Sequence, residues 1–134
     1  MLSLFPQFLS YDLYGSFLVR VTVALVLLYI GIMTNSVKKP SYEVKMRVRD
    51  YSFPRFIPII FGTAEIITGV FLLVGFLTQL MVLIAIYIFI NLFFIEKYAA
   101  RVFDFKNIFY VAMVVISLSL LFLGPGAFAV DLPL

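Results

Sequence analysis

The stretch PIIFGTAEIITGVFLLVGFLTQLMVLIAIYIFINLFFI, residues 58–95, decides the fold class of this chain. It contains two apolar runs, 58–76 and 78–95, and each is close to the roughly 20 residues that a helix needs to cross the hydrocarbon core of a bilayer. The short turn around Gly75 and Gln79 is all that separates them. The two predicted helices must therefore be antiparallel neighbours.

Two further runs of the same kind complete the pattern, at residues 13–33 and 107–124. All four are apolar around the whole helix circumference, which is typical of helices in lipid. The sequence therefore predicts an all-α integral membrane protein, a single domain over residues 1–134 that forms a four-helix up-and-down bundle. An arrangement of three spans and one re-entrant segment stays open, because the run 78–95 is short for a span.

The composition agrees with a membrane protein. Hydrophobic residues make up 64% and charged residues 13% of the chain, against roughly 45–50% and about 25% in ordinary soluble domains. The chain has no Cys and no His, which excludes thiol chemistry, disulfides, haem ligation by imidazole and the usual zinc sites. We expect no metal site and no covalently bound cofactor.

The distribution of positive charge predicts the orientation. Of the ten Lys and Arg residues, Arg20 lies within a span, and the other nine lie in the loop 35–56 or in the segment between the third and fourth spans. The positive-inside rule makes that side cytoplasmic. We expect a multi-pass protein of the cell (inner) membrane with both termini on the outer side. The net charge of +3 then reflects orientation, and we expect no nucleic-acid binding.

The basic cytoplasmic loop 35–56 allows two interpretations. Pro40 can begin a helix in which apolar residues such as Tyr42 and Val44 alternate with cations, and this helix would lie on anionic lipid headgroups. The alternation through residues 44–50 fits a strand period equally well. A solvated loop that only fixes the topology therefore stays open.

Two ionisable residues lie at membrane depth, where each costs at least about 2.5–3.5 kcal/mol, so both are candidates for function. At 1.5 Å per residue, Glu65 lies on the order of 16 Å below the outer surface, and Arg20 lies about 10 Å below it. Because the Arg side chain is long, we expect Glu65 to meet Arg20 directly or through one polar group.

Thr68, Tyr87 and Ser117 fall at heights comparable to that of this charged pair. The candidate ligand-binding residues are therefore Arg20, Glu65, Thr68, Tyr87 and Ser117. Such a polar pocket would suit the head of a lipophilic molecule such as a quinone, with Glu65 taking or giving a proton. The alternative is that the charged pair only fixes helix packing. The sequence identifies no catalytic residue.

The last span ends in Gly124, Pro125 and Gly126, with Asp131 five residues further on. This ending resembles the GPG-x-x-S-L-D motif of the DoxX family of small four-helix bacterial membrane proteins. The first span around Arg20 and the segment AEIITGVFLLVGFLTQL, residues 64–80, are similar to other motifs of that family. The resemblance implies a four-helix fold in which the turn carries Asp131 back to the outer surface.

The chain departs from the family pattern at Ala127 and Ala129, where Arg and Ser are usual, and at Gln79, where Arg is common. Some DoxX members look like membrane subunits of a thiosulfate to quinone oxidoreductase, and others like partners of oxidative-stress enzymes. The resemblance thus implies a redox-associated membrane subunit that binds quinone and docks a soluble oxidoreductase. A non-catalytic structural or assembly protein is the alternative, followed by a small proton-coupled transporter. Homo-oligomerisation stays open.

Overall fold

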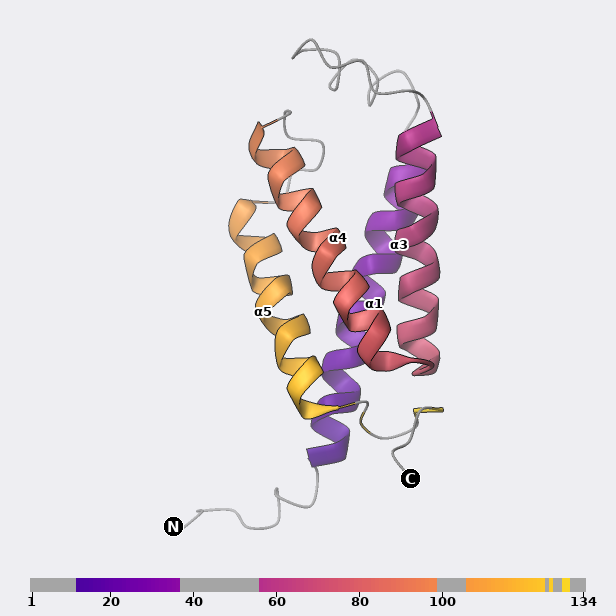
Figure 1. Ribbon diagram of the computed structural model, residues 1–134, viewed down its shortest axis with the longest axis vertical. Helices are drawn as coiled ribbons and strands as arrows, with labels where there is room; N and C mark the ends of the chain where they lie inside the picture. The colour runs from indigo at the N-terminus through magenta and orange to yellow at the C-terminus, as the bar shows by residue number, and fades with distance from the viewer. Residues whose placement is uncertain (1–11, 37–55, 99–105, 125, 127–128, 131–134) are drawn as a thin grey trace.

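The structure is a computed structural model that describes residues 12–36, 56–98, 106–124, 126 and 129–130 (Figure 1). Within these ranges the chain forms four helices and no strand: α1 (Asp12–Ser36), α3 (Phe56–Val74), α4 (Thr78–Tyr98) and α5 (Asn107–Leu123). Successive helices run in opposite directions along the long axis (Figure 1). The predicted all-α class is confirmed, and each helix falls within three residues of its predicted ends.

Helices α1, α4 and α5 each bury a stripe of residues spaced alternately three and four positions apart. On α1 the stripe consists of Ser16, Arg20, Val23, Leu27, Ile30 and Thr34, and on α4 of Thr78, Val82, Ala85, Phe89, Leu92 and Glu96. On α5 it consists of Tyr110, Met113, Ser117 and Leu120. A repeat of this length is typical of helices that pack nearly antiparallel, at about 20° to one another.

Helices α1 and α3 make the most extensive contact, and α4 and α5 form the second pair. Glycines bring the first pair close together. A Cβ atom on Gly31 would lie 2.8 Å from Cγ1 of Ile66, and one on Gly69 would lie 2.9 Å from Cγ of Leu28. These distances are too short for any side chain, so both glycines allow the helix backbones to approach.

The turn between α3 and α4 matches the tight turn expected near residues 75–79. Gly75 has a φ of 72°, which glycine adopts without strain. Its amide and that of Phe76 donate to the carbonyl oxygens of Leu72 and Phe71 at 3.2 and 3.1 Å. This pattern is the Schellman motif, which satisfies the last carbonyl groups of α3.

Helix α5 ends where the GPG sequence predicts. Gly124 follows the last helical residue with a φ of 82°, and Gly126 has a φ of 73°. The Ser16 hydroxyl donates to the carbonyl oxygen of Gly124 at 2.6 Å, which joins the first turns of α1 to the end of α5. Pro125 and Asp131 lie outside the described residues, so the predicted return of Asp131 to the bundle stays a prediction.

Large apolar side chains cover the outside of the bundle. Examples at least half exposed are Leu18, Leu25, Ile67, Leu83 and Val115. Helices α1 and α4 are long and apolar enough to cross a membrane, over Tyr14–Asn35 and Thr78–Lys97, whereas the apolar parts of α3 and α5 are shorter.

Candidate functional site

Most buried polar side chains gather toward the two ends of the bundle, and the core between them is apolar except for Thr68 and Ser117. We call the end at Gly75 and Gly124 the turn end, and the end at Ser36 and Lys106 the loop end. The polar residues toward the turn end are Ser16, Arg20 and Thr78, and those in the loop half are Thr34, Glu65, Glu96 and Tyr110. Fully buried apolar residues separate the two groups, among them Val23, Leu27, Leu72 and Val82.

Glu65 lies midway along α3 and is only 1% exposed. The Thr34 hydroxyl, on the facing side of α1, donates to its Oε2 atom at 3.1 Å. The same hydroxyl lies 2.9 Å from the carbonyl oxygen of Ile30. Gly31 and Gly62 make this contact feasible, because their missing side chains let α1 lie against α3 at this level.

This geometry offers a hydrogen bond to either protonation state of Glu65. A hydroxyl group carries one proton and can accept two hydrogen bonds. When Glu65 is ionised, Thr34 donates its proton to the carboxylate. When Glu65 is protonated, the carboxyl group donates to Thr34, which turns its own proton to Ile30. Proton gain or loss at Glu65 therefore needs only the rotation of one hydroxyl.

The second carboxyl oxygen of Glu65, Oε1, is buried and has no hydrogen-bond partner among the described residues. A buried polar atom in this condition is unusual, because leaving it unsatisfied costs about 1–3 kcal/mol. Such exceptions call for an explanation, and a proton-exchanging role for the carboxyl group is one.

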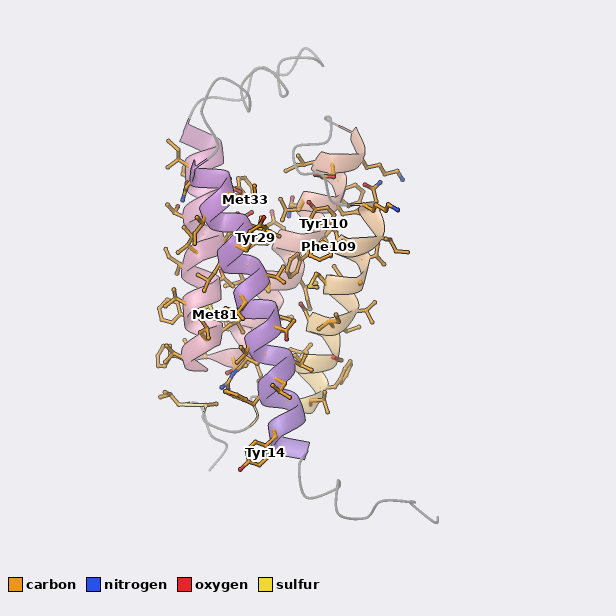
Figure 2. All side chains as sticks on the ribbon, turned by 180° about the vertical axis from the view of Figure 1, so that it is seen from behind. Tyr14, Tyr29, Met33, Met81, Phe109 and Tyr110 are labelled. Atoms are coloured by element: carbon orange, nitrogen blue, oxygen red, sulfur yellow. The ribbon has the colours of Figure 1, made fainter. Side chains whose placement is uncertain are left out.

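Tyr110 and Glu96 continue the polar group toward the loop end. Tyr110, on α5, is fully buried, and it interacts with the carboxyl group of Glu96 on α4, which is only 5% exposed. Figure 2 shows Tyr110 in the same half of the bundle as Tyr29, away from Tyr14. With Thr34 on α1 and Glu65 on α3, all four described helices thus place polar groups in this half of the core.

Arg20 does not pair with Glu65, so this prediction is wrong. Its Nη1 atom lies 2.6 Å from the position that a Cβ atom on Gly75 would occupy, beside Ala129. Gly75 follows Glu65 by ten residues, which is about 15 Å along a helix. The long side chain of Arg20 extends toward the turn end while staying fully buried, and its Cζ atom lies 5.4 Å from the centre of the Phe17 ring.

Tyr87 does not face the interior, which corrects the predicted pocket. Its side chain is 63% exposed, because it lies off the buried stripe of α4, between Ala85 and Phe89 but on the other side of the helix. The prediction used only the height of Tyr87 along the span. Height does not determine which way a helical residue faces, since each residue is turned by about 100° from the last.

Thr68 and Ser117 are buried, as predicted, but no described hydrogen bond joins either to Glu65. The Thr68 hydroxyl donates to the carbonyl oxygen of Ala64 in its own helix at 2.8 Å. Ser117 is fully buried, and its Oγ atom has no hydrogen-bond partner among the described residues. The structure therefore separates Arg20 and Tyr87 from the other candidates, and ligand binding by Glu65, Thr68 and Ser117 stays a prediction.

Sequence reasoning missed Thr34, Glu96 and Tyr110. All three lie on the buried stripes of their helices, at spacings of three or four from the preceding or following core residue. That spacing was the signal that could have found them. Most of the basic loop 35–56, with its expected contact to anionic lipid, lies outside the described residues.

Comparison with protein families, with curated proteins and with solved structures finds no match to this chain.

Proposed function

We propose that this chain is a four-span integral membrane protein in which Glu65 takes up and releases a proton, and that it acts as the membrane subunit of a quinone-linked redox system. One observation carries the proposal. The buried Glu65 carboxyl group has a hydroxyl partner, Thr34, that can serve both of its protonation states.

The placement in the membrane is supported by the apolar exterior of the bundle and by helix length. Helices α1 and α4 are long enough to cross a bilayer. At 1.5 Å per residue, α3 and α5 are about 28 Å and about 25 Å long, slightly less than the roughly 30 Å hydrocarbon core. Local thinning of the bilayer accommodates a difference of this size at small cost. The loop end, near Lys97 and Lys106, then faces the cytoplasm.

The proposed chemistry is the reduction of a quinone, which takes up two electrons and two protons to become a quinol. The electrons come from a reduced soluble oxidoreductase that docks on the membrane subunit. Glu65 supplies the protons one at a time and is reprotonated after each transfer. The resemblance to DoxX proteins and the basic loop 35–56, which suits an acidic partner or anionic lipid, support this assignment.

A second candidate, a non-catalytic structural or assembly protein, is favoured by the close α1–α3 contact at Gly31 and Gly69. In that case Glu65 and Thr34 would serve only to join the two helices. A small proton-coupled transporter is a third candidate, and it would use Glu65 in the same way as the first but move a solute instead of supplying a quinone.

Quinone binding to the purified protein tests the first candidate against the second. The protein in lipid nanodiscs is titrated with decylubiquinone, and the infrared C=O band of protonated carboxyl groups is recorded. We expect saturable binding above that of empty nanodiscs, with a change in a band that is absent from Glu65→Gln. The control Thr63→Ala, an exposed position on the same helix, should behave as the wild type. Absence of saturable binding to the wild-type protein would remove the quinone assignment.

A further inference from the structure

We propose that two copies of this chain pair in the membrane through the outer face of α4, with Tyr87 and Asn91 at the centre of the contact. The inference goes beyond the proposed function. It rests on the membrane placement of the bundle, and it is independent of quinone binding and of the proton chemistry of Glu65.

Tyr87 and Asn91 bring polar groups to the outer face of α4 at the middle of the bilayer. Tyr87 is 63% exposed, and Asn91, one turn further on, is partly exposed. Tyr87 lies nine positions after Thr78 and ten before Lys97, the ends of the apolar stretch of α4, so it is about 14–15 Å from each end. Tyrosine is enriched at the membrane interfaces, where its hydroxyl group meets water. From the middle of the bilayer the hydroxyl group of Tyr87 reaches neither interface.

These two side chains have hydrogen-bonding capacity that the bundle does not use. The amide nitrogen of Asn91, Nδ2, donates to the carbonyl oxygen of Tyr87 at 2.7 Å, which leaves its second N–H group and its oxygen for other partners. The Tyr87 hydroxyl makes no hydrogen bond within the described residues. Polar groups that stay unsatisfied in hydrocarbon are costly, and lipid tails offer them no partner.

Exposed polar side chains on the neighbouring helices are already satisfied. The Thr22 hydroxyl on α1 donates to the carbonyl oxygen of Leu18 at 2.8 Å. The Thr63 hydroxyl on α3 donates to the carbonyl oxygen of Ile59 at 2.9 Å. Tyr29, which is also exposed, has an interaction within the chain. The unused polar groups at the middle of the described spans therefore lie together on α4.

The two polar residues belong to a seam that runs along the outside of α4, on the side away from its buried stripe. The members of the seam are spaced alternately four and three positions apart, the repeat of helices that pack side by side at about 20°. All are at least partly exposed, and they are Leu80, Ile84, Tyr87, Asn91 and Phe94. A second helix can therefore pack along α4 without disturbing the bundle.

A second copy of this chain fits the seam because the seam is complementary to itself. Copies insert into the membrane with the same orientation, so two α4 helices that meet run parallel. A two-fold axis along the membrane normal then places each residue opposite its own counterpart. Hydroxyl and amide groups both donate and accept hydrogen bonds, so Tyr87 can bond to Tyr87 and Asn91 to Asn91 across the axis. An Asn in an otherwise apolar seam also fixes the register of two paired helices.

Oxidative cross-linking tests which face meets the second copy. Because the chain has no native Cys, a single Cys is introduced on the seam as Ile84→Cys, and the full-length protein is reconstituted in phosphatidylcholine vesicles. The controls Leu25→Cys on α1 and Val115→Cys on α5 lie at exposed apolar positions of other helices. With copper phenanthroline as oxidant, we expect a covalent dimer for Ile84→Cys in several-fold higher yield than for either control.

The strength of pairing tests the role of the polar groups. Copies labelled at Lys106→Cys with donor or acceptor fluorophores report the dissociation constant of the dimer in the same vesicles by energy transfer. We expect Asn91→Leu and Tyr87→Phe each to raise the dissociation constant by about threefold or more, the usual effect of losing a hydrogen bond between membrane helices. Thr22→Ala, which removes an exposed hydroxyl that is satisfied within α1, should change it by less than about twofold.

Three results would overturn the proposal. They are energy transfer that shows only monomers at every protein-to-lipid ratio, preferential cross-linking at Leu25→Cys or Val115→Cys, and an unchanged dissociation constant in both Tyr87→Phe and Asn91→Leu. An unchanged melting temperature shows that these variants keep the fold. Glu65→Gln should pair as the wild type does, so failure of the quinone assignment and failure of the dimer are distinguishable.

Discussion

The hydroxyl group of Thr34 lies 3.1 Å from Oε2 of Glu65, and this hydrogen bond joins α1 to α3 inside the core. It spans 31 positions of sequence and connects two side chains that are at most 9% exposed. The bond has two consequences, since it holds the two helices in register and gives the carboxyl group a partner in either protonation state.

Replacing Thr34 with Val should therefore leave both oxygens of Glu65 without a hydrogen bond from the described residues. We expect a loss of about 1–3 kcal/mol in the free energy of unfolding, the usual cost of an unsatisfied buried polar group. The infrared C=O band of protonated Glu65 should move to higher frequency. Thr34→Ser keeps the hydroxyl group and is the control, and its band should stay near the wild-type position. Equal spectra for the two variants would contradict the assigned hydrogen bond.

The glycine contacts make a second prediction about α1. A Cβ atom on Gly31 would lie 2.8 Å from Ile66 and 3.0 Å from the carbonyl oxygen of Gly62, whereas one on Gly15 would meet nothing within 4 Å. Gly31→Ala should lower the free energy of unfolding by about 1–3 kcal/mol through overpacking. Gly15→Ala, in the same helix, should be neutral or slightly stabilising. Thermal unfolding in one detergent compares them, and similar melting temperatures would show that the helices do not pack as described.

Alanine substitutions at the two turn-end glycines with positive φ distinguish the cost of backbone strain from the cost of a steric clash. Gly75 and Gly124 have φ angles of 72° and 82°, so alanine is strained at both, by about 1–2 kcal/mol. Only at Gly75 would the new methyl group also meet the Arg20 guanidinium group. Gly75→Ala should therefore destabilise the protein more than Gly124→Ala in the same unfolding assay. The reverse order would place the Arg20 side chain elsewhere.

The sequence predicted the helices well and the site less well, for reasons that single residues illustrate. Hydropathy marks where a span begins and ends, and the observed helices agree with it. Thr34 and Glu96 each lie one residue beyond a predicted span, 13–33 or 78–95, because a hydropathy criterion stops at the first polar residue. Yet the buried stripes continue through both residues.

The direction of a side chain was the other thing that the sequence could not determine. Arg20 and Glu65 carry opposite charges and lie on adjacent helices, which favours an ion pair between them. However, the long Arg side chain reaches the turn end, and Glu65 has a closer partner in Thr34. Which partner a buried side chain meets depends on how far one helix is shifted along the other. For α1 and α3 this shift is set by glycine contacts spread along both helices.

The last prediction concerns α4, which links the turn end to the loop end. Gln79 and Lys106 are both exposed, and α4 is the only described helix that lies between them in the chain. Because the chain has no native Cys, a single Cys can be introduced at either position and labelled with a membrane-impermeant maleimide. If α4 crosses the membrane in the expected orientation, Gln79→Cys reacts in intact spheroplasts. Lys106→Cys reacts only after the membrane is permeabilised.

Each pattern of labelling then has one meaning. Reaction of Lys106→Cys alone in intact spheroplasts would reverse the orientation. Reaction of both positions from the same side would mean that α4 does not cross the membrane. In that case the apolar exterior of the bundle would need another partner than lipid, and the four-span proposal would be wrong.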